Sequence, residues 1–156
     1  MPQPVPEGYH TITPYLAVDD ASAAIDFYQR ALRAKERARM SGPGGSVMHA
    51  ELEIGDSLVM LSDPFPQAST RPPKELGGTS VSIFVYVKDI DALYKQAVDA
   101  GATSLMEPDD MFWGDRFGSV QDPFGHTWTI ATHVEDVSPE EMEKRSQEFF
   151  ATMAQS

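Results

Sequence analysis

Hydrophobic and polar residues alternate along several short stretches of the chain, which is the pattern of strands with one buried face. The clearest case is 47–54, where Ala50 and Leu52 share one face while His49 and Glu51 share the other. Related patterns, bounded by Gly, Pro and Asp, predict further strands. They cover residues 12–18, 35–40, 57–61, 80–87, 104–106, 117–121 and 127–132.

Three other stretches repeat apolar residues at helical spacing. Asp19 or Asp20 can cap the first helix, whose apolar stripe runs through residues 21–32. Asp89 can cap the second. The segment 138–141, Ser-Pro-Glu-Glu, opens the third with a capping box and a proline in the first turn.

The order strand, helix, three strands occurs twice, and residues 18–20 align on residues 87–89. Such self-similarity predicts an α+β fold built from a duplicated βαβββ unit within a single domain. The predicted parts are a first module at 10–63, a Pro/Gly/Ser-rich linker at 64–78, a second module at 79–135 and a C-terminal helix at 136–156.

Composition narrows the possible partners. Lys and Arg total 12 against 24 Asp and Glu, a formal charge of −12, which disfavours binding to nucleic acid or to an anionic membrane. The absence of cysteine excludes disulfides, cysteine-based zinc sites and cysteine nucleophiles. No apolar run approaches the roughly 20 residues of a membrane span, and the N-terminus lacks the pattern of a signal peptide. We therefore expect a cytoplasmic protein.

The ordered segments YLAVDD, HAELEIGDSLVMLSD and DPFGHTWTIATH resemble the vicinal oxygen chelate superfamily, the glyoxalase/bleomycin-resistance/dioxygenase fold. TPYLAV and FWGDRFGSVQDPFG are similar to its PhnB-like branch. The similarity runs over residues 10–135. It implies strongly curved sheets, helices on their outer faces, a cavity on the concave side and a homodimer.

Metal-dependent members of this superfamily place a His or Glu on each of four strands. Carried over by motif, these positions fall on Thr13, Met60, Ser82 and Thr129. Hydroxyls and a thioether do not replace carboxylates or imidazoles around a divalent ion. The expectation is therefore no metal and no other cofactor, with a displaced metal site at His49 and Glu51 as the alternative.

His49 and Glu51 are the candidate catalytic residues. They are two residues apart on one strand, so both side chains point to the same face, the predicted cavity. There they could act as a general base and its orienting partner, or simply as polar pocket groups. In the alternative interpretation His49 bonds to a neighbouring strand and Glu51 lies on a solvated rim.

Eight further residues are predicted to line the ligand cavity. They are Thr13, Tyr15, Met60, Ser82, Phe84, Trp113, Arg116 and Thr129. Trp113 and Phe84 could stack on a planar ligand or fill the core. Arg116 could bind a carboxylate, or could instead pair with Asp110 or Asp115.

Three functions from different classes fit this sequence. The first is a metal-free binder that holds a small organic molecule in a cavity. The second is a lyase, isomerase or dioxygenase that uses a displaced metal or the His49–Glu51 pair. The third is a structural dimer without ligand chemistry, its cavity filled by side chains. No nucleophile or phosphate-binding motif is present, so the sequence leaves open whether the protein is an enzyme.

Overall fold

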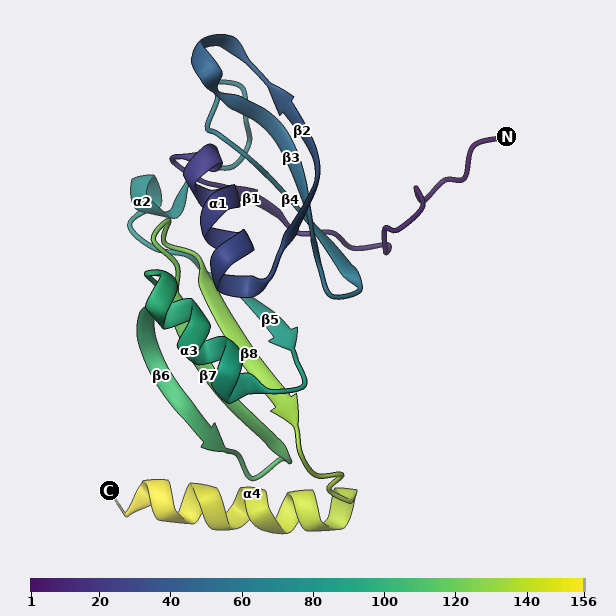
Figure 1. Ribbon diagram of the computed structural model, residues 1–156. Coiled ribbons are helices and arrows are strands. Elements are labelled where there is room, and N and C mark those ends of the chain that lie inside the picture. The colour runs from purple at the N-terminus through teal and green to yellow at the C-terminus, as the bar shows by residue number, and fades with distance from the viewer. Residues whose placement is uncertain (156) are drawn as a thin grey trace.

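The computed structural model describes residues 1–155 and shows two four-stranded sheets, one in each half of the chain (Figure 1). The first module consists of β1 (Tyr15–Ala17), α1 (Ala21–Leu32), β2 (Lys35–Ser41), β3 (Val47–Ile54) and β4 (Ser57–Ser62). The second consists of β5 (Ser82–Tyr86), α3 (Ile90–Ala100), β6 (Thr103–Asp110), β7 (Asp115–Gln121) and β8 (Thr127–His133). The predicted α+β fold of duplicated βαβββ modules is confirmed.

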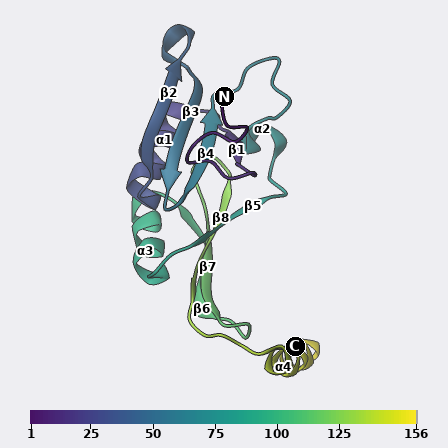
Figure 2. The same ribbon diagram turned by 90° about the vertical axis from the view of Figure 1, so that its right-hand side faces the viewer.

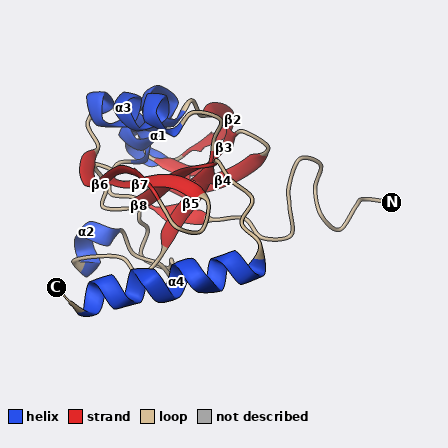
Figure 3. Ribbon diagram, turned by 90° about the horizontal axis from the view of Figure 1, so that it is seen from below, coloured by secondary structure: helices blue, strands red, loops and turns tan. Residues whose placement is uncertain are grey.

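The two sheets share one connectivity. Their strand orders are β1-β4-β3-β2 and β5-β8-β7-β6, and in each the first strand of the module runs parallel to the last. The other pairs are antiparallel. α1 and α3 pack against each other and cover the same side of both sheets (Figure 3). The opposite, concave side of each sheet carries no such cover.

Local chemistry explains the two covering helices. Asp20 caps α1, its Oδ1 accepting from the amide of Ala23 at 3.1 Å, and Asp89 caps α3 by the same contact to Ala92 at 3.1 Å. Each helix buries an apolar stripe against its sheet. The stripes comprise Ala21, Ala24, Ile25, Phe27, Tyr28, Ala31 and Leu32 in α1 and Ile90, Leu93 and Ala97 in α3.

A buried carboxylate joins the two modules. Asp122 is 4 % exposed, and its Oδ1 accepts from the amides of Phe124 at 2.9 Å and His126 at 3.0 Å. Its Oδ2 accepts from Trp128 Nε1 at 2.9 Å and from the hydroxyl of Tyr28 at 2.5 Å. Because Tyr28 belongs to α1, this one side chain ties the first module to the turn between β7 and β8.

The turn at 122–125 needs glycine at its last position. Gly125 has φ +92°, and a Cβ added there would lie 2.7 Å from Cβ of Pro73. Glycine therefore allows both the turn and the close approach of the linker, which forms the short helix α2 (Pro73–Leu76).

Three strands differ clearly from their predicted bounds. β1 has three residues, so Ile12, which the sequence pattern places in this strand, precedes it and is 85 % exposed; Val81 likewise precedes β5. β6 is longer than predicted and includes Pro108. It lies at a sheet edge, where a residue without an amide donor is tolerated.

The helix α4 (Pro139–Ala154) lies beyond the end of the second sheet, on the side away from α1 and α3 (Figures 1 and 3). None of its residues is buried. It is held by a ring contact between Phe149 and Phe112, at 5.1 Å between centroids, and by Arg145, which donates to the carbonyl of Phe112 at 3.2 Å. Within residues 1–155, no helix has the length and apolarity needed to cross a membrane.

Replacing Tyr28 by Phe removes one donor from the buried Asp122 carboxylate. We expect the free energy of unfolding to fall by about 2 kcal/mol, because a hydrogen bond to a charged group contributes roughly 1.5–3 kcal/mol. Urea denaturation followed by circular dichroism measures the change. Tyr94→Phe is the matched control, since its hydroxyl contacts Ser104 at an exposed site. Equal losses in the two variants would contradict the role given to Asp122.

Candidate functional site

A chain of hydrogen-bonded side chains lies on the concave face of the first sheet. The register of β1, β4 and β3 places Tyr15 opposite Met60 and Met60 opposite Glu51, so the three form one row across the sheet. Their strand neighbours Leu16 and Ala50 point the other way and are buried under the helices. The side chains of this row therefore face away from the core and can contact a ligand, whereas the side chains on the reverse face of the sheet belong to the core.

His49 bridges two members of this face. Its Nε2 lies 3.1 Å from Glu51 Oε2, and its Nδ1 lies 3.1 Å from the hydroxyl of Tyr15. A neutral imidazole with its proton on Nε2 satisfies both contacts, donating to Glu51 and accepting from Tyr15. The two predicted residues thus contact each other, and His49 also bonds across β4 to Tyr15 of β1.

Tyr9 adds a contact to this site that the sequence did not suggest. Its hydroxyl donates to Glu51 Oε1, so each oxygen of the carboxylate has a partner. Tyr9 belongs to a proline-rich arm without periodicity, which lies on the side of the first sheet opposite α1 (Figures 1 and 2). No local pattern could reveal a contact that depends on how this arm crosses the sheet.

The hydrogen bonds set the charge of Glu51. Donation from Tyr9, and then from His49, holds the pKa of Glu51 below its ordinary value. Burial and the adjacent carboxylate raise the pKa of Tyr9 to about 12. Glu51 is therefore ionised at neutral pH while Tyr9 stays protonated. A carboxylate with a lowered pKa is a poor general base but a good acceptor for a ligand's donor group.

The second sheet presents aromatic rings instead. Phe117 stacks on Phe84 with centroids 6.5 Å apart, and Trp113 meets Phe117 edge-on at 5.3 Å. Tyr86 lies 5.0 Å from Phe84. Phe84 and Tyr86 are 47 % and 62 % exposed, so these rings do not fill a closed core within one chain.

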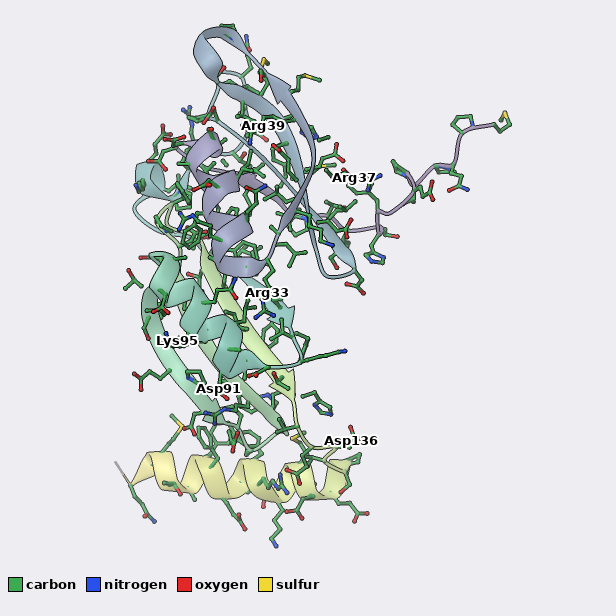
Figure 4. The ribbon with its side chains drawn as sticks, in the orientation of Figure 1. Arg33, Arg37, Arg39, Asp91, Lys95 and Asp136 are labelled. Carbon is green, nitrogen blue, oxygen red and sulfur yellow. The ribbon has the colours of Figure 1, made fainter. Side chains whose placement is uncertain are left out.

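Trp113 and Tyr86 also anchor a buried carboxylate at the end of this sheet. Asp115 is 4 % exposed and accepts from Tyr86 at 2.9 Å, Trp113 Nε1 at 3.2 Å and His133 Nδ1 at 2.8 Å. The Nε2 of His133 lies 2.7 Å from Asp136, whose place after β8 is labelled in Figure 4. Asp115 and His133 are opposed across β7 and β8, a pairing that only the strand register reveals.

The charged forms of Asp115 and His133 stabilise each other. Burial alone would raise the pKa of Asp115, but its donors, His133 foremost, outweigh burial and hold that pKa below its ordinary value. The bonds to Asp115 and Asp136 raise the pKa of His133. Three fixed donors leave Asp115 little capacity for a ligand, and we assign it a structural role.

The four positions that correspond to the superfamily's metal ligands do not fit a divalent ion. Ser82 Oγ and Thr129 Oγ1 hydrogen-bond to each other at 2.8 Å, while Thr13 precedes β1 and Met60 lies in the row with Glu51. Hydroxyl and thioether groups are weak ligands for a divalent metal ion. Over the part of the chain that the structure describes, no group of three or more His, Cys, Asp or Glu side chains could hold a metal ion.

Arg116 lies away from the other candidate residues. It donates twice to Asp91 on α3, at 3.0 Å from Nε and from Nη2, and once to Asp110 at 3.3 Å. These bonds place its guanidinium on the helix side of β7 and raise its pKa. Asp91 is labelled on α3 in Figure 4. The charge of Arg116 is already paired in this arrangement.

A groove of about 1320 Å³ runs between the first module and β5. Thr13 and Phe84 are the predicted ligand-lining residues that reach it, and the arm residues His10 and Ile12 form part of its wall. The predicted residues other than Thr13 and Arg116 form two separate sets, one on each sheet. They are Tyr15, His49, Glu51 and Met60 on the first sheet and Ser82, Phe84, Trp113 and Thr129 on the second.

The paired βαβββ modules and their open concave faces define the class of this protein. The family model of the Glyoxalase/Bleomycin resistance protein/Dioxygenase superfamily matches residues 8–130, and the chain belongs to this superfamily. The resemblance inferred from the sequence motifs is therefore confirmed.

Relatives and solved structures agree with this assignment. An uncharacterized protein of Mycobacterium tuberculosis strain H37Rv is 44 % identical over 135 residues, covering 85 % of this chain and 79 % of that protein. Protein YjdN of Escherichia coli K12 is 27 % identical over 145 residues, 76 % of this chain and 92 % of that protein. The crystal structure of TioX from Micromonospora sp. ML1 superposes with a TM-score of 0.66 at 28 % identity, covering 80 % of this chain and 99 % of TioX. A PhnB protein from Bacillus cereus shares the fold, with a TM-score of 0.61 at 18 % identity over 79 % of this chain and 99 % of that one.

Replacing Tyr9 by Phe removes the hydrogen bond that contributes most to the low pKa of Glu51. We expect that pKa to rise, because the carboxylate loses its strongest donor while keeping its place on the sheet. A carbon-detected NMR titration of the glutamate carboxyl groups measures it. Tyr86→Phe, which removes a donor from Asp115 on the other sheet, should leave the pKa of Glu51 unchanged. An unaltered Glu51 titration in the Tyr9 variant would show that the contact is not formed in solution.

Proposed function

We propose that this protein binds a small organic molecule on the concave face of its first sheet and does not transform it. The observation that carries this proposal is the partly buried, ionised carboxylate of Glu51, held on the sheet face with donors on both oxygens. A fixed negative charge in a partly desolvated place recognises a complementary donor more strongly than an exposed one does.

The chemistry of the face indicates what kind of molecule fits. A ligand that carries an ammonium or hydroxyl group would find its acceptor in Glu51, while an acidic ligand would meet a carboxylate in a chain of net charge −12.

A second candidate function is a lyase, isomerase or oxygenase reaction assisted by the same residues. The order Tyr15, His49, Glu51 favours it, because a carboxylate orients an imidazole whose other nitrogen lies in reach of a hydroxyl. In this case His49 rather than Glu51 would be the base, since Glu51 has the lowered pKa. Product formed by the wild type and lost in His49→Gln would favour this candidate over simple binding.

We further propose that the protein acts as a homodimer whose second copy covers the exposed aromatic surface. Phe84 and Tyr86 are 47 % and 62 % exposed on the second sheet, and Phe150 and Met153 are exposed on α4. Contiguous apolar surface of this kind is typical of a protein interface. A structural dimer without a ligand is the remaining alternative, and it requires the side chains of Tyr15, Met60, Phe84 and Trp113 to fill the cavity.

Replacing Glu51 by Gln tests the binding proposal. Aryl amines and hydroxyaryl compounds that bind the wild type, found by thermal shift and quantified by calorimetry, should bind the variant about 10-fold to 100-fold more weakly, the range expected for a lost charged hydrogen bond. Glu53→Gln is the control: it makes the same charge change two residues along β3, at an exposed position. Equal affinities in wild type and Glu51→Gln would refute the anchor role, and a panel without any binder would refute the binding function.

Light scattering of the wild type should give twice the chain mass if the dimer forms. Phe84→Asp should then give a monomer, because a charge buried in an apolar interface opposes association. Phe65→Asp is the control, since Phe65 is similarly exposed but lies in the linker. A monomeric wild type at the concentrations of the binding assays would exclude the proposed assembly.

A further inference from the structure

The N-terminal arm is held on the concave face of the first sheet by contacts that resemble those of a bound molecule. The Tyr9 hydroxyl donates to Glu51, and the guanidinium of Arg37 on β2 lies over the Tyr9 ring, 5.4 Å from its centroid. Arg37 Nη2 also donates to the carbonyl of Glu7 at 2.9 Å. Figure 4 labels Arg37 on β2, beside the arm. The phenol is thus recognised both at its ring face and at its hydroxyl.

Gly8 permits this close approach. It has φ +86°, and a Cβ added there would lie 2.6 Å from Nη1 of Arg37. On the far side of Tyr9, His10 Nε2 lies 3.1 Å from the carbonyl of Asp56 in the turn between β3 and β4. The sequence of the arm therefore fits the position that the arm occupies on the sheet.

Little of the arm's surface is buried against the sheet. Residues 1–8 are exposed and Tyr9 is only half-buried. An exposed segment that is held by a few polar contacts opens at a small fraction of the free energy of global unfolding. The arm also lines the groove through His10 and Ile12, so its release would widen that groove.

We propose that Tyr9 is a built-in occupant of a ligand subsite formed by Glu51 and Arg37. The subsite accepts an aromatic ring that carries a hydrogen-bond donor, because the carboxylate takes the donor and the guanidinium covers the ring face. The natural ligand displaces the Tyr9 side chain and adopts its two contacts. This inference rests on the proposed binding function and adds to it the ligand class and the competing segment.

Competition from within the chain has a measurable consequence. A site that is occupied by its own arm for part of the time shows an affinity reduced by the open fraction. Removing the phenol should therefore raise the affinity for a free phenol, whereas an ordinary contact residue would lower it when truncated. The direction of the change separates a displaced occupant from a binding residue.

The test uses 4-methylphenol, which reproduces the tyrosine side chain. Tyr9→Ala should bind it at least about 10-fold more tightly than the wild type, measured by NMR titration of the full-length protein. Toluene, which lacks the hydroxyl, should bind the variant about 10-fold or more weakly than 4-methylphenol does. Tyr94→Ala is the matched control: it also removes a partly buried tyrosine with a hydrogen-bonded hydroxyl, which contacts Ser104 away from the groove, and it should leave the affinity at the wild-type value.

A second variant keeps the Tyr9 side chain. Gly8→Ala introduces a Cβ at a positive φ, which strains the backbone of the arm even if the Arg37 side chain moves aside, and this should lift the arm and raise the affinity for 4-methylphenol in the same direction. The inference is wrong if neither variant binds 4-methylphenol more tightly than the wild type, or if toluene binds Tyr9→Ala equally well. Measuring the aryl amine and hydroxyaryl panel on Tyr9→Ala separates the two proposals. If the panel compounds bind Tyr9→Ala and this binding still depends on Glu51, the binding function holds and only the proposed role of the arm is wrong. If no compound binds, both proposals are wrong.

Discussion

The carboxylate of Asp122 is the interaction on which the arrangement of the two modules depends. A buried charge is costly unless it is fully hydrogen-bonded, and its four donors come from the turn, from β8 and from α1. Burial and this neighbouring charge raise the pKa of Tyr28 well above its ordinary value, so the phenol is protonated and donates at neutral pH. One side chain thereby fixes how the helix layer of the first module meets the last strand of the second.

That arrangement determines where chemistry can occur. With α1 and α3 packed side by side on one face, the concave faces of both sheets are free of these helices, and the first is covered in part by the N-terminal arm. The first carries the polar chain of Tyr9, Glu51, His49 and Tyr15, and the second carries the aromatic rings around Phe84. The first sheet of this scaffold thus carries a site that accepts hydrogen bonds, and the second sheet carries a flat apolar surface.

Much of this could be predicted from the sequence, because strand alternation, helix caps and the DPFG turn are local features. The contact between His49 and Glu51 follows from their spacing on one strand. The seat of Tyr9 and the pairing of Asp115 with His133 could not be predicted, since they depend on the path of an aperiodic arm and on the register of two strands. Arg116 illustrates the same limit: alternation alone does not show that its face carries Asp91 of α3.

The duplication makes the two halves comparable, and each contains a carboxylate that accepts from a tyrosine and a histidine. In the second module Tyr86 is part of β5, and the Asp115 side chain is 5 % exposed with three fixed donors. In the first, the tyrosine belongs to the arm, and the Glu51 side chain is 20 % exposed. A carboxylate whose donors are all built into the framework can only stabilise that framework. A carboxylate whose main donor sits on a weakly held segment can exchange it for a group of the same chemistry, and this difference is why we place ligand recognition at Glu51.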